Sequence, residues 1–71
     1  MMVHKKETSI ILNSFLNGNF SLLDINLINN INLKIRPDDF KFKCTHTYLI
    51  ISAHERIYYI PYTKIIYMEV I

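Results

Sequence analysis

The chain has 71 residues, of which 51% are hydrophobic and 20% are charged, and its formal net charge is +2 at pH 7. This composition argues against intrinsic disorder, which needs few apolar residues and a high net charge, and no apolar run approaches the roughly 20 residues that span a bilayer. A domain this small buries only about 60% of the surface that its unfolded chain exposes. We therefore predict one domain that covers its surplus apolar surface by association with another copy or another protein.

Two further features of composition bear on the compartment. Cys44 is the only cysteine, so no disulfide can form within the chain, which fits a reducing environment. The start of the chain is basic and has a short apolar run, but polar residues interrupt that run and a small-residue cleavage site is absent. We expect a cytoplasmic protein without a membrane segment.

The first predicted element is a helix over residues 7–17. Its apolar side chains share one helical face: Ile11, Leu12, Phe15 and Leu16. Thr8 or Ser9 can cap its start. Gly18 stands where a residue in the left-handed conformation commonly ends a helix.

Residues 20–28 are compatible with two structures. Apolar and polar residues alternate there, which favours a strand, and Asn29 and Asn30 would then form a tight turn because asparagine tolerates positive φ. The alternative is an α+β fold in which residues 21–29 form a second helix. The alternation that follows, over residues 31–36, predicts a half-buried strand.

The second half of the chain predicts further strands separated by turns. Pro37 marks a turn, and a strand is expected over residues 39–52, whose last part is apolar throughout and therefore predicted to be central and covered on both faces. Residues 53–55 make a hairpin connection. The final strands, residues 56–60 and 65–70, are joined at Pro61, which cannot donate a hydrogen bond to a ladder.

This order of elements resembles an Sm-like barrel, in which a one-turn 3₁₀ connection joins the fourth and fifth strands and those two strands pair between subunits to close a ring. Ile60 and Ile65 keep the spacing of the family's isoleucine-arginine-glycine-x-x-isoleucine run, but Pro61 and Tyr62 replace the arginine and glycine of its uridine pocket. The tyrosine-isoleucine-proline strand end is similar to that of small barrels from spore-forming bacteria. The resemblance implies a mainly β fold: an N-terminal helix followed by a five-stranded Sm-like or SH3-like barrel.

The resemblance also implies a function, which is self-association through the last two strands. The candidate interface residues are Tyr58, Ile60, Ile65, Tyr67 and Glu69. We therefore predict a non-enzymatic oligomeric interaction module, a homo-oligomer that could also take a protein partner.

The alternative function is RNA or DNA binding by an Sm-like protein. Aromatic residues beside basic ones can stack on bases and neutralise phosphates. The candidate nucleic-acid surface consists of Lys34, Arg36, Lys41, Lys43, Tyr62 and Lys64. The net charge of +2 permits such binding without arguing for it.

Metal binding and catalysis have little support. Cys44 and His46 would share a strand face and His54 could approach them across a hairpin, but a metal site needs three or four convergent ligands, and zinc-type spacing is absent. With a single glycine the chain has no glycine-rich phosphate loop. We expect no cofactor, no metal and no enzymatic activity.

Overall fold

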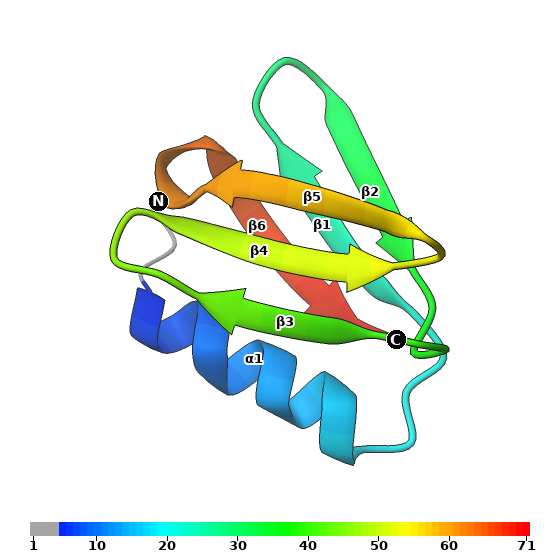
Figure 1. The fold of residues 1–71 in the computed structure, drawn as a ribbon. Coiled ribbons are helices and arrows are strands. Elements are labelled where there is room, and N and C mark those ends of the chain that lie inside the picture. Colours follow the sequence, from blue (N-terminus) through cyan, green and yellow to red (C-terminus); the bar gives the residue numbers. More distant parts are fainter. Residues whose placement is uncertain (1–4) are drawn as a thin grey trace.

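The computed structural model describes residues 5–71, which form one N-terminal helix and six strands (Figure 1). In chain order the elements are α1 (Lys5–Asn17), β1 (Leu23–Leu27), β2 (Ile31–Ile35), β3 (Lys41–Cys44), β4 (Tyr48–Ala53), β5 (Arg56–Pro61), the 3₁₀ turn η1 (Tyr62–Lys64) and β6 (Ile65–Val70). The very short connection expected between the last two strands is therefore present as η1.

The six strands form two antiparallel three-stranded sheets, in the orders β2-β1-β6 and β3-β4-β5. The sheets face each other with their strands at an angle, and α1 packs against β3 and β6 (Figure 1). Both sheets are open, so the prediction of a five-stranded closed barrel is corrected to two open sheets of six strands in all. The mainly β class with an N-terminal helix is confirmed.

The extra strand arises because the predicted strand 39–52 is divided in two. Thr45 and Tyr48 close a turn between β3 and β4, where the Thr45 backbone N–H donates to the Tyr48 carbonyl at 2.9 Å. The Thr45 hydroxyl donates to the same carbonyl at 2.7 Å and accepts from the Tyr48 N–H at 3.0 Å. A threonine side chain that bonds its own backbone neighbours favours such a turn over a continued strand.

The other turns follow the expectations from sequence. Asn29 and Asn30 have φ of 63° and 60°, and β1 pairs with β2 across them, so residues 21–29 are not a second helix. The connection between β4 and β5 is a two-residue hairpin turn in which His54 and Glu55 have φ of 54° and 65°. Positive φ at both central residues is the signature of a type I′ turn, whose twist matches that of the strands.

The helix ends at Asn17, as predicted, but its start and the conformation of the residue after it differ from the prediction. It begins at Lys5, so Thr8 and Ser9 lie inside it and do not cap it, and the residues before Lys5 lie outside the described part of the chain. Gly18 does not have positive φ, so the predicted left-handed cap is wrong. A Cβ atom on Gly18 would lie 2.6 Å from the Phe20 ring, and it is this close approach that requires glycine there.

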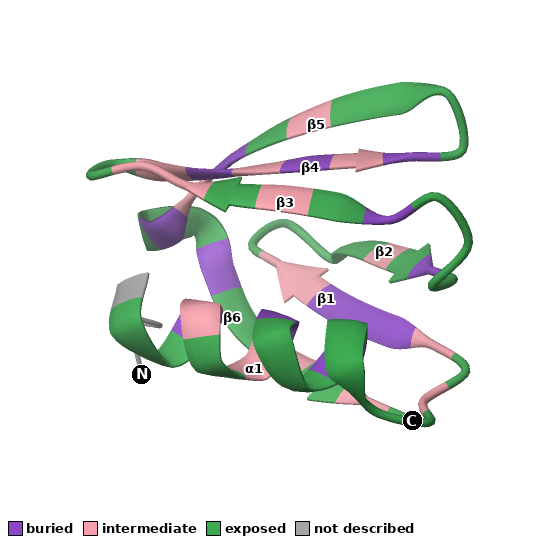
Figure 2. Ribbon diagram, turned by 60° about the horizontal axis from the view of Figure 1, so that its bottom comes forward, coloured by how far each residue is buried: buried purple, intermediate pink, exposed green. Residues whose placement is uncertain are grey.

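The core lies between the two sheets and α1 (Figure 2). It consists of Leu12, Phe15, Leu23, Ile25, Ile35, Phe40, Leu49, Ile51, Ala53, Ile60, Tyr62 and Ile65. On β4 only alternate residues are buried, while Tyr48, Ile50 and Ser52 are half-buried. The strand is central, as predicted, but the expectation that both its faces are covered is wrong, because no element within residues 5–71 packs on the outward face of this sheet (Figure 2).

Candidate functional site

β5 is the outer strand of its sheet, so in the described part of the chain no strand lies beside one of its edges. The Tyr62 N–H just after β5 donates to the Thr47 carbonyl at 3.4 Å. Hydrogen bonding alternates from residue to residue along an antiparallel strand. The backbone groups of Ile57, Tyr59 and Pro61 therefore point to the free edge, and the proline stands where an edge strand tolerates the loss of its N–H.

The last two strands carry a large share of the exposed apolar side chains. Ile57 and Tyr59 on β5 are 60% and 64% exposed, and Ile66 and Tyr67 on β6 are each 49% exposed. β6 is also an outer strand, with β1 on one side and contacts to α1. The predicted interface included Tyr67 but not Ile57, Tyr59 or Ile66, because both faces of these strands are apolar and periodicity does not distinguish them.

The predicted interface residues divide between the core and the surface. Ile60 and Ile65 are 4% and 2% exposed and pack inside the monomer, so their side chains contribute no surface. Tyr58 is half-buried and packs against the core. Tyr67 and Glu69 are exposed on the outward face of β6, directly across from Asn26 and Asp24 of β1.

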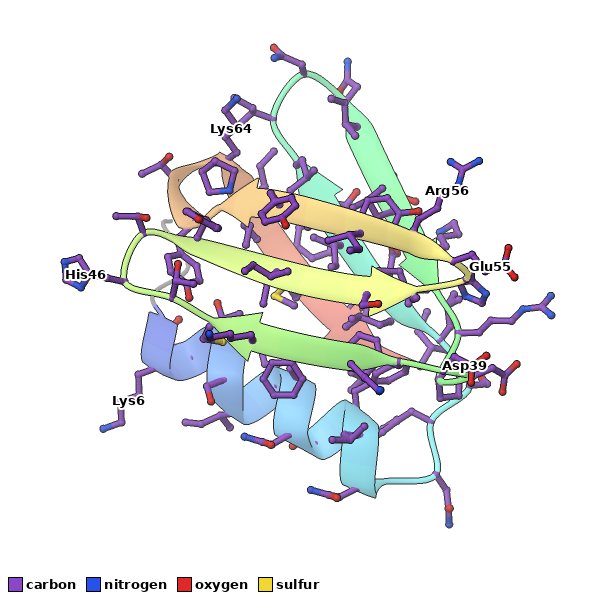
Figure 3. All side chains as sticks on the ribbon, in the orientation of Figure 1. Lys6, Asp39, His46, Glu55, Arg56 and Lys64 are labelled. Carbon is purple, nitrogen blue, oxygen red and sulfur yellow. The ribbon has the colours of Figure 1, made fainter. Side chains whose placement is uncertain are left out.

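The residues predicted to contact nucleic acid do not form one surface. Lys34 lies on the sheet that contains β2, whereas Lys41 and Lys43 project from the outward face of the other sheet. Arg36 follows β2 and is exposed, and Lys64 lies in η1 at the opposite corner of the molecule from Asp39 (Figure 3).

Tyr62, the aromatic member of that set, is a core residue with 7% of its surface exposed. Its hydroxyl donates to the Thr45 carbonyl at 2.8 Å, which ties η1 to the turn between β3 and β4. Burial raises the pKa of Tyr62 to about 12, with smaller contributions from a hydrogen bond and a charge interaction with Cys44. A ring held in this way cannot stack on a base, so Tyr62 has a structural role.

Polar side chains cluster on the outward face of β1 and β2. Asp24 is only 9% exposed and accepts a hydrogen bond from the Asn32 amide, which also lies 3.1 Å from Asn26 Oδ1. Lys34 Nζ is 3.5 Å from the Asp24 carboxylate. Asn26 Nδ2 has no hydrogen-bond partner among the described residues, but the contacts of Asn32 and Lys34 with Asp24 join β1 to β2 and so stabilise their pairing.

The positions of the histidines and the cysteine bear on metal binding, and the length of the helix bears on membrane insertion. Within residues 5–71, no group of three or more His, Cys, Asp and Glu side chains is placed to hold a metal ion. His46 and His54 lie in the turns at the two ends of β4, so the two histidines do not come together with Cys44 in one site. In that same part of the chain, no helix is long and apolar enough to cross a membrane.

Lys41 and Lys43, which the sequence placed in the candidate nucleic-acid surface, share the outward face of the β3-β4-β5 sheet with Ile50 and Tyr59. Across the three strands, Lys41 lies opposite Ser52, and Lys43 lies opposite Ile50. An open hollow of about 150 Å³ lies over this part of the face, lined by Lys41, Phe42, Lys43, Ile50 and Ser52. The signal in the sequence is the pair of lysines at alternate positions beside a strand whose residues are all apolar or small.

Comparison of the chain with models of protein families, with curated proteins and with solved structures finds no match.

Proposed function

We propose that the protein is a non-enzymatic interaction module that assembles with copies of itself through its last two strands. The observation that carries this proposal is the free edge of β5, flanked by the exposed side chains of Ile57 and Tyr59. An edge strand with unpaired backbone groups and apolar side chains is a template for pairing with another strand.

The proposed partner strand is β6 of a second copy. β5 and β6 each contain six residues, so their lengths match in a shared ladder. The exposed Ile66 and Tyr67 mark the part of β6 that α1 leaves uncovered. Because the two paired surfaces differ, the contact is head-to-tail and produces a ring if the rotation between copies closes.

As part of the same proposal, the assembled copies have an arrangement like that of Sm-like rings. It is supported by η1, a 3₁₀ connection of three residues between the last two strands. The two open sheets of one copy would then be joined edge to edge with those of its neighbours. We place the protein in the cytoplasm, since Cys44 is its only cysteine.

The test compares two substitutions at one position. Tyr59→Pro removes the N–H that faces the free edge, whereas Tyr59→Thr removes the aromatic ring but keeps that donor and a high strand propensity. The side chain is exposed, so neither change disturbs the core. We expect Tyr59→Pro to shift the native mass measured by light scattering toward 8.5 kDa, with Tyr59→Thr remaining near the parent mass. A folded Tyr59→Pro variant that keeps the mass of the parent would contradict the proposed edge.

A further inference from the structure

We propose that the outward face of the β3-β4-β5 sheet binds single-stranded nucleic acid, with phosphates along Lys41 and Lys43 and bases lying across Ile50 toward Tyr48 and Tyr59. This site differs from the set predicted from sequence, since Tyr62 is buried and Lys34 lies on the other sheet. It uses the face of the sheet and not its edge, and because Tyr59 also flanks the edge proposed for self-association, the aromatic test variant is placed at Tyr48.

The register of the sheet arranges these side chains in rows. One row runs Lys41, Ser52, Ile57 and the next runs Lys43, Ile50, Tyr59, from β3 across β4 to β5. Neighbouring strands are about 4.8 Å apart, so roughly 10 Å separates the lysine side of the face from its tyrosine side. Charge therefore lies along one margin, and an apolar and aromatic surface begins directly beside it.

The aromatic side of the face consists of a tyrosine pair. The rings of Tyr48 and Tyr59 meet edge to face, with their centroids 5.9 Å apart and their planes at 61°. Tyr59 is 64% exposed although it lies in a sheet, and the half-buried Ile50 and Pro61 extend the apolar surface around it. Base–aromatic stacking is tolerant of sequence because every base has a π face.

The positive charge of this face favours a partner that carries negative charge. Both charged residues in the two rows are lysines, and the hollow between Lys41, Lys43 and Ile50 contains no carboxylate. A second copy stacked face to face would offer only lysines, tyrosines and apolar side chains, so it would bring no acidic group to either lysine. A strand of nucleic acid instead offers phosphates to the lysines and flat bases to the tyrosines, so it complements both margins.

The site is tested with a fluorescently labelled single-stranded oligothymidylate and the full chain, by anisotropy over a range of salt concentrations. Tyr48→Ala is the main aromatic variant because it lies in the central strand, away from the free edge of β5. We expect it to weaken binding about fivefold or more. Lys41→Gln with Lys43→Gln should weaken binding further and reduce the slope of log K against log salt by about 0.7 per lysine.

The matched controls carry comparable changes elsewhere. Leu16→Ala removes an exposed large side chain from α1, away from this face and from the last two strands, and Lys6→Gln with Lys64→Gln removes the same net charge from outside the face. These controls should bind within about twofold of the parent. The proposal is overturned if the oligothymidylate does not bind at low salt, if the controls lose as much affinity as the test variants, or if a duplex of equal length binds as tightly.

Discussion

Replacing Tyr62 with phenylalanine tests the connection that holds the η1 corner to the β3–β4 turn. The change removes one buried hydroxyl, which donates to the Thr45 carbonyl at 2.8 Å, and leaves the ring in the core. A hydrogen bond of this kind contributes about 0.5 to 1.5 kcal/mol net. For a domain of this size, a loss of about 1 kcal/mol lowers the melting temperature by roughly 4 to 8 °C. We expect that decrease at pH 8.

The same substitution has the opposite effect at high pH. The pKa of Tyr62 is raised from 10.0 in the unfolded chain to about 12 in the folded protein, first because burial desolvates the phenolate and then because of Cys44. A raised pKa stabilises the fold below pH 10, and that stabilisation is lost as the pH rises through 12. Two pKa units correspond to about 2 to 3 kcal/mol. The phenylalanine variant lacks this loss, so we expect it to become the more stable protein between pH 10 and 12.

The assay is urea unfolding of the parent and of Tyr62→Phe at pH 8 and at several pH values from 9.5 to about 12. Tyr67→Phe serves as the control because that hydroxyl is on an exposed residue, so its loss should change the free energy of unfolding by less than about 0.5 kcal/mol at pH 8. If the free energies of unfolding of parent and Tyr62→Phe run parallel across this range, the hydroxyl is not buried and bonded as described.

Three further predictions concern the turns and the polar cluster, and urea unfolding measures each of them. Gly18→Ala should cost about 1 to 3 kcal/mol because its Cβ would lie 2.8 Å from a backbone carbonyl oxygen, and a neutral result would refute the close approach. His54→Asn with Glu55→Gly should add about 0.5 to 1 kcal/mol, since both positions have positive φ; a loss would argue against a type I′ turn. Asn32→Ala should destabilise the fold by about 1 to 3 kcal/mol because it removes the hydrogen bond to Asp24. Lys34→Ala should cost less than about 1 kcal/mol, since the Lys34 side chain is 61% exposed. The reverse order of the two losses would contradict the described hydrogen bonds.

Much of the strand pattern could be predicted from the sequence because alternation of apolar and polar residues reports one buried face. The segments 31–36, 56–60 and 65–70 correspond to β2, β5 and β6 within one residue at each end. The division of 39–52 could not be predicted in this way. Threonine favours strands as much as turns, and only the hydrogen bonds of Thr45 with Tyr48 decide which one forms.

The sequence predicted the exposed residues of the candidate site less well than it predicted the strands. On β5 both faces are apolar, so the sequence does not show that Ile60 enters the core while Ile57 and Tyr59 remain exposed. That distinction follows from the register with β4, whose Leu49 and Ile51 are fully buried. Barrel closure likewise depends on how the sheets pack, and the order of the strands along the chain does not determine it.

The central claim is that the last two strands join copies of this chain, and the native mass of the parent tests it most directly. Light scattering on a gel-filtered sample gives that mass independently of shape. We expect one discrete oligomer whose mass is 8.5 kDa multiplied by a whole number of two or more. Added salt should not change the number of copies, because apolar contacts and backbone pairing hold the oligomer together. A single species of 8.5 kDa at micromolar concentrations would contradict the account.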